Sequence, residues 1–179
     1  MKIKLFPAFT TLLIVSSCVI PFGTQYRAPI LLASFTENDV RVSIQLDNPQ
    51  QNIYRLSATF MPPEGYHLYS KDIPLTGIDG LGRPTLLELT PNSQIKSLGE
   101  LIESVEAEEP NFEPRELMVY PSGMVTLSLP IELPQGADWV DETVSITYMS
   151  CSERGCKAPV IGKLVNISVP GADTFAKGQ

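Results

Sequence analysis

Histidine, cysteine and basic residues are all scarce in this chain of 179 residues. It has one histidine, His67, and three cysteines, and its 13 lysines and arginines against 20 aspartates and glutamates give a net charge of −7. A single histidine with no nucleophile elbow or metal motif around it gives no support for a conventional hydrolase. An acidic surface without a basic stripe is repelled by phosphate backbones, so nucleic acid is not an expected partner.

Long hydrophobic runs are also missing, except near the start of the chain. Lys2 and Lys4 precede an apolar stretch over residues 5–15, a pattern typical of a targeting segment. The stretch is too short, and interrupted by Pro7, to be a comfortable membrane span, and no later run approaches that length. The protein is therefore expected to be exported.

The end of this segment, Val15-Ser-Ser-Cys18, resembles the bacterial lipobox, in which a cysteine is lipidated and becomes the mature amino terminus. Residues 1–17 are then a lipoprotein-type signal peptide, and Cys18 holds the protein at a membrane, facing the periplasm. Residues 18–37 are predicted to be a tether. The alternative is an ordinary secretory signal cleaved further on, for example after Ala33, with Cys18 lost.

Residues 38–170 have the alternating pattern of half-buried strands. Val40, Val42, Ile44 and Leu46 alternate with polar residues, which indicates a strand with one buried face. Similar strands are predicted at residues 54–60, 66–71, 85–89, 117–120, 125–131, 144–148 and 160–169. Many short strands with turn signals between them predict an all-β protein, a β-sandwich, and a flexible tail over residues 171–179.

Two segments depart from this simple pattern. Residues 94–109 combine partial helical spacing with many glutamates, and of a surface helical turn and an acidic loop we prefer the loop. Pro130 falls inside a predicted strand and has no N–H for a β-ladder. That strand is therefore expected to lie at an edge or to be bulged there.

Two cysteines, Cys151 and Cys156, with four residues between them, lie between two strand-like runs, at or near the mouth of a predicted β-hairpin. Disulfides persist outside the cytoplasm, and with Cys18 lipidated these two remain as one pair. A ring of about six residues should add only about 2 kcal/mol of stability by the chain-entropy relation. Such a bond could open and close without unfolding its domain.

The residues themselves leave two uses of the pair open, a structural staple and reversible redox exchange. Exchange requires a thiolate, which Arg154 and Lys157 would stabilise and Glu153 would oppose. A zinc site is disfavoured, because only His67 and the two cysteines could serve as ligands without a carboxylate. No metal and no other cofactor is expected.

Two segments together resemble the amino-terminal periplasmic domain of the thiol:disulfide interchange protein DsbD. They are Gly65-Tyr-His-Leu-Tyr-Ser-Lys-Asp-Ile73 and Tyr148…Cys151-x4-Cys156-Lys-Ala-Pro159, within a similarity from about Val40 to Val169. The resemblance implies an immunoglobulin-like sandwich whose cysteine pair shuttles electrons. It further implies a thioredoxin-like donor fed by a membrane thiol carrier, with extracytoplasmic thiol oxidoreductases as acceptors.

The resemblance also implies roles for aromatic residues. Phe112, in the segment 109–113, matches a cap that covers the disulfide until a partner docks; the alternative is an ordinary core phenylalanine. His67 and Tyr69 would lie beside the cysteines on one strand face, with Tyr66 on the other. His67 stands where the family can carry tyrosine, and its alternative is a half-exposed strand histidine.

Two departures from the family limit what can be carried over. The best-known member has five residues between its cysteines, not four, so the loop details do not transfer. The chain also stops after this domain, so a membrane carrier and thioredoxin-like proteins would have to act in trans on a monomer.

Cys156, beside Lys157, is slightly favoured as nucleophile. The rival hypothesis is a non-catalytic sandwich lipoprotein that binds a protein partner, with the pair as a staple.

Overall fold

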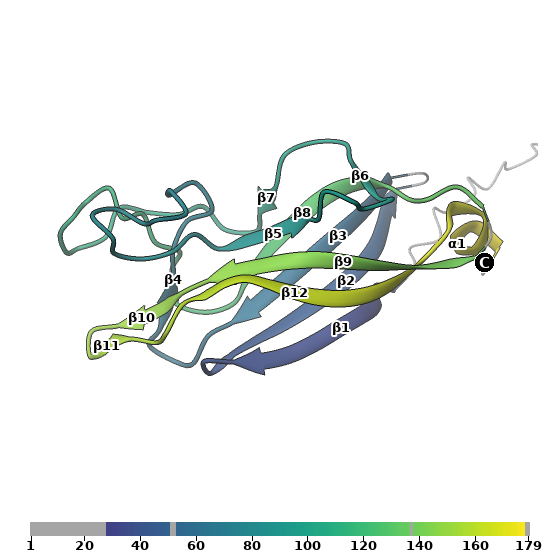
Figure 1. Ribbon diagram of the computed structural model, residues 1–179. Coiled ribbons are helices and arrows are strands. Elements are labelled where there is room, and N and C mark those ends of the chain that lie inside the picture. Colours follow the sequence, from purple (N-terminus) through teal and green to yellow (C-terminus); the bar gives the residue numbers. More distant parts are fainter. Residues whose placement is uncertain (1–27, 51–52, 137, 178–179) are drawn as a thin grey trace, which may run out of the picture.

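The computed structural model describes residues 28–50, 53–136 and 138–177, which form an elongated antiparallel β-sandwich (Figure 1). The first sheet has the order β1-β2-β3-β8-β6, and β7 also pairs with β8. Its strands are β1 (Ile30–Glu37), β2 (Val40–Gln50), β3 (Ile53–Met61), β6 (Lys96–Ser97), β7 (Ile102–Glu103) and β8 (Val125–Glu132).

Two three-stranded sheets complete the fold. One has the order β12-β9-β5 and lies against the first sheet, and the other has the order β11-β10-β4. Their strands are β4 (His67–Leu68), β5 (Leu86–Leu89), β9 (Trp139–Tyr148), β10 (Ser150–Ser152), β11 (Gly155–Cys156) and β12 (Val160–Pro170). The small sheet lies at one end of the sandwich, and the short helix α1 (Ala172–Lys177) lies at the other (Figure 1).

The main core follows from the alternation read in the sequence. Every second residue is buried in β2 from Val40 to Leu46 and throughout β8, because successive side chains of a strand point to opposite faces. These residues meet apolar side chains from β3, β9 and β12 in one cluster between the two large sheets. The predicted all-β sandwich is confirmed.

Three details of the predicted organisation need correction. Residues 30–37 are not part of a tether: they form β1, which pairs with β2 from Glu37↔Val40 to Ile30↔Leu46. Residues 117–120 pair only through isolated bridges rather than as a strand. The tail contains α1, which the sequence pattern did not indicate.

Of the two unusual segments, the acidic one behaves as predicted, but the strand with Pro130 lies neither at an edge nor in a bulge: β8 lies between β3 and the short strands β6 and β7, and its register with β3 has no shift. Residues 94–109 are a loop with two short strands, β6 and β7, and no helix. The Pro130 carbonyl accepts a hydrogen bond from the Leu98 N–H at 2.9 Å, so its missing N–H faces the same side. On that side β8 pairs with two separate short strands, β6 and β7, and the β-ladder is interrupted between them at the proline.

Candidate functional site

The cysteine pair lies in the β10–β11 hairpin, as the sequence predicted. Cys151 and Cys156 are directly opposite each other and form a disulfide with an S–S distance of 2.02 Å and a Cα–Cα distance of 4.0 Å. On the other side of β10, Cys151 is opposite His67 of β4. Paired residues of antiparallel strands share a face, so Cys156, Cys151 and His67 form one row across three strands.

Local sequence explains why the hairpin forms here. Gly155 has a φ of 137°, a conformation that residues with a side chain rarely adopt, and it follows the turn at Glu153-Arg154. The Ser152 hydroxyl accepts a hydrogen bond from the Arg154 N–H at 3.3 Å. After the turn, the Lys157 N–H donates to the Ser150 carbonyl at 2.9 Å and closes the ladder.

The two sulfur-bearing residues differ sharply in exposure. Cys151 is only 2% exposed and packs in a small apolar cluster with Tyr69, Ile73, Leu117 and Val119. Cys156 is exposed to solvent. Of the two residues, Cys156 is therefore the more accessible to an incoming thiol.

The aromatic residues that the sequence assigned to the site gather around His67. Its ring stacks on Phe112, with centroids 5.8 Å apart and an interplanar angle of 27°. Tyr69, which directly follows β4, meets the same ring edge-on, with the ring centroids 5.4 Å apart. Phe112 is exposed rather than a core residue, at 36%, and it contacts the row of Cys156, Cys151 and His67 at its His67 end.

Burial changes the titration of these groups. The Nε2 atom of His67 is buried and has no hydrogen-bond partner among the described residues. Burial lowers the pKa of His67, because the charged imidazolium loses its hydration. Burial likewise raises the pKa of the Tyr69 hydroxyl. Both groups are therefore neutral at pH 7.

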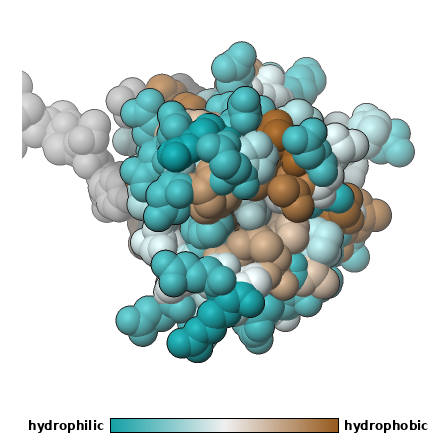
Figure 2. All heavy atoms as spheres, turned by 90° about the vertical axis from the view of Figure 1, so that its left-hand side faces the viewer, coloured by the Kyte–Doolittle hydropathy of each residue, from teal (hydrophilic) through white to brown (hydrophobic). Residues whose placement is uncertain are grey.

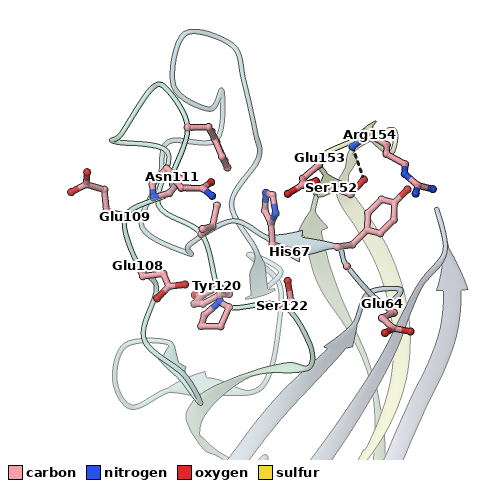
Figure 3. A pocket seen from close by; sticks show the side chains of 16 residues that line it. Glu64, His67, Glu108, Glu109, Asn111, Tyr120, Ser122, Ser152, Glu153 and Arg154 are labelled. Carbon is pink, nitrogen blue, oxygen red and sulfur yellow. Dashed lines mark hydrogen bonds between the residues drawn. The ribbon is translucent and has the colours of Figure 1, made fainter.

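A groove of about 910 Å³ opens above His67, between the loop of residues 108–112 and the hairpin (Figure 3). His67 points into it from β4, as Figure 3 shows. The charged residues that line it are mostly acidic: Glu64, Glu108, Glu109, Glu153 and Arg154. Viewed from this end, apolar patches lie within a largely hydrophilic surface (Figure 2).

Two further residues that the sequence assigned to the site, Tyr66 and Lys157, lie together. Tyr66 lines the groove, but its ring faces the ammonium of Lys157, 5.6 Å from the centroid. That ammonium also forms an ion pair with Asp39 at 2.5 Å. The expectation that Lys157 stabilises a thiolate on Cys156 is therefore not supported, and the exposure of Cys156 is the better reason to favour it. Cys18 lies outside the described residues.

The sequence analysis missed the residues that hold β4 in place. The Tyr120 N–H donates to the Leu68 carbonyl at 2.9 Å. The Tyr120 hydroxyl accepts from the Lys71 N–H at 3.1 Å and donates to Glu103 at 2.6 Å. Burial and the Glu103 carboxylate raise the pKa of this hydroxyl, which stays protonated. The only sequence signal was an aromatic residue at the end of a predicted strand.

The described residues contain neither a membrane-spanning helix nor a metal-binding cluster. No helix in that part of the chain has the length and apolar character needed to cross a membrane. Within the same residues, no three histidine, cysteine, aspartate or glutamate side chains are grouped so that they could hold a metal ion.

Fold and site together define an antiparallel β-sandwich with a disulfide in a hairpin at its end, one sulfur-bearing residue exposed and the other buried. A crystal structure of the Neisseria meningitidis DsbD n-terminal domain in the reduced form is similar to it, with a TM-score of 0.41 and 19% sequence identity. The match covers 69% of this chain and 89% of that one. No family model and no curated protein sequence matches the chain.

Proposed function

We propose that this protein carries out thiol–disulfide interchange outside the cytoplasm through a reversible Cys151–Cys156 disulfide. The observation that carries the proposal is the placement of the bond. It joins an exposed residue to a buried one in a small sheet at the end of the sandwich, apart from the main core. Opening it leaves the packing between the two large sheets unchanged. The domain can therefore remain folded in both redox states.

In this proposal the domain is a thiol–disulfide oxidoreductase that acts as an electron relay. A donor thiolate attacks Cys156, the S–S bond breaks, and its electron pair passes to Cys151. The second donor thiolate then attacks the mixed disulfide, which leaves the donor oxidised and both cysteines reduced. The resemblance suggests a membrane thiol carrier or thioredoxin-like protein as donor and periplasmic thiol oxidoreductases as acceptors.

We place the domain at a membrane through a lipid on Cys18, which would raise its effective concentration near a membrane donor. β1 begins at the end of the sandwich opposite the cysteine hairpin (Figure 1). A tether entering at that end leaves the disulfide at the end of the domain away from its point of attachment. Partners would then meet the groove without a clash with the anchor.

A redox titration tests the proposal against the staple hypothesis. We expect a reduction potential above about −300 mV, because structural disulfides fall below that value and exchange-active ones above it. The measurement is equilibration of the protein in dithiothreitol or glutathione buffers, followed by alkylation of free thiols. A potential below about −300 mV, together with unchanged partner binding in the double alanine variant of Cys151 and Cys156, would establish a staple.

Phe112 is proposed as the cap of the site, and its removal should speed the opening of the disulfide. Aromatic pairs contribute about 0.5–1.5 kcal/mol, so loss of the stack on His67 should raise the rate of reduction by dithiothreitol about two- to tenfold. Trp139→Ala is the matched control, because Trp139 is another exposed aromatic residue, at the start of β9. An unchanged rate in Phe112→Ala would show that the ring does not shield the site.

A further inference from the structure

His67 is a polar group of the site to which the electron relay assigns no task. It is directly opposite Cys151 in the β4–β10 pair, and its Nε2 atom is buried without a hydrogen-bond partner among the described residues. A buried polar atom without a partner costs free energy and calls for an explanation. The ring is held in this position by Phe112 on its face and by Tyr69 at its edge.

The exchange requires a group near Cys151 that can take its proton and return it. Its surroundings are apolar, with Tyr69, Leu117 and Val119 among its neighbours, and burial of this kind disfavours a thiolate. Reduced Cys151 is therefore a thiol. It must lose a proton before it can attack, and it must regain one after it leaves. Solvent reaches it poorly, because Cys151 is only 2% exposed.

We propose that His67 is the proton-transfer group for Cys151, accepting its proton when the disulfide closes and returning one when it opens. The inference rests on the proposed function, because it concerns the same exchange. On closure, the Cys151 thiol gives its proton to Nε2 and its sulfur attacks Cys156 in a mixed disulfide. The bond from Cys156 to the partner breaks, and the partner leaves as a thiolate with the electron pair. The imidazolium then releases its proton into the groove.

The position of His67 suits a neutral base that accepts a proton better than a permanently charged group. Because burial lowers the pKa of His67, the neutral imidazole is the resting form at pH 7 and is ready to accept a proton. The ring points into the groove (Figure 3), and the buried Nε2 atom reaches solvent there once Phe112 moves off the ring. The titratable and charged groups that line this groove or contact the ring are Glu64, Tyr66, Tyr69, Glu108, Glu109, Tyr120, Glu153 and Arg154.

The test follows the closure step by itself. The reduced protein is mixed with 5,5′-dithiobis(2-nitrobenzoate) in a stopped-flow instrument. The first nitrothiobenzoate is released when Cys156 attacks the reagent, and the second when Cys151 closes the disulfide. We expect His67→Gln to slow the second release about a hundredfold at pH 7, at the low end of general acid–base effects. The first release should change less than about twofold, and it is the internal control.

The pH profile gives a readout that a merely structural role would not move. In the wild type the second release should be constant above the His67 pKa and fall about tenfold for each pH unit below it, as the neutral base is lost. Because His67 is the sole histidine in the sequence, its pKa is read directly from NMR, and we expect it below about 6.5. In His67→Gln the rate should instead rise steadily towards the pKa of the thiol.

His67→Phe, which cannot accept a proton, should behave like His67→Gln and replaces it if the glutamine variant does not fold by circular dichroism. Equal closure rates in the wild type and a folded variant, or a wild-type profile without an inflection at the NMR pKa, would overturn the role of His67. Neither outcome touches the proposed function, which fails on its own tests: a potential below about −300 mV and no capture of thioredoxin-like partners.

Discussion

Cys151→Ala is expected to capture thioredoxin-like partners as a stable mixed disulfide, and Cys156→Ala is expected to capture none. The first variant retains the exposed cysteine, and the second retains the one that is buried among apolar side chains. A buried thiol reacts only when the structure opens locally. An opening cost of about 3 kcal/mol would slow the reaction roughly a hundredfold, since about 1.4 kcal/mol corresponds to a factor of ten.

Two measurements check this asymmetry. Mixed disulfides with a thioredoxin-like protein that has lost its resolving cysteine are separated on non-reducing gels, and alkylation of each free thiol with iodoacetamide is timed by mass spectrometry. Alkylation in urea is the control, because both thiols should then react at similar rates. Equal capture by both variants would mean that Cys151 is as accessible as Cys156. Capture by neither would remove the relay function.

Leu68→Ala is expected to lower the free energy of unfolding by about 2–5 kcal/mol, the usual range for removing a buried leucine side chain. Leu68 is 1% exposed and belongs to the main core, although it lies in β4 between His67 and Tyr69. Its side chain fixes the strand that presents both aromatic residues to the disulfide. The loss is a large part of the 5–15 kcal/mol typical of a whole domain.

Chemical denaturation of the oxidised protein measures this loss, with Leu75→Ala as the matched control. Leu75 is 58% exposed in the loop that follows β4, so its removal should change stability by no more than about 0.5 kcal/mol. A loss below about 1 kcal/mol for Leu68→Ala would show that the core does not hold β4. The positions of His67 and Tyr69 would then depend on the pairing of β4 with β10 and on the hydrogen bond from Tyr120.

Much of the fold could be predicted because the strands alternate strictly. The buried positions of β2 and β8 follow a period of two, and prolines and glycines separate the strands. β1 was missed because partly buried residues occur next to each other in it and its register shifts between Leu31 and Ala33. Its role as a strand depends on pairing with β2, which local pattern does not reveal.

The candidate site was predictable in part for a different reason. Cys151 and Cys156 are near in sequence, so their hairpin is a local structure, and the disulfide required no knowledge of the fold. Phe112 is far from them in sequence, and only the resemblance suggested that it belonged to the site. Its stack on His67 depends on how the loop of residues 108–112 folds over β4.

The sequence by itself determined that two neighbouring cysteines would face each other across a β-hairpin at the end of a strand, because strand alternation and turn residues act over short distances. Only the tertiary structure decided which of them a partner can reach. Cys151 is buried because Tyr69, Leu117 and Val119 are brought to it from distant parts of the chain, and His67 lies beside it because β4 pairs with β10. The burial of Cys151 and its contact across the strands depend on residues that are far apart in sequence. The tertiary structure therefore makes one cysteine of the pair buried and the other exposed.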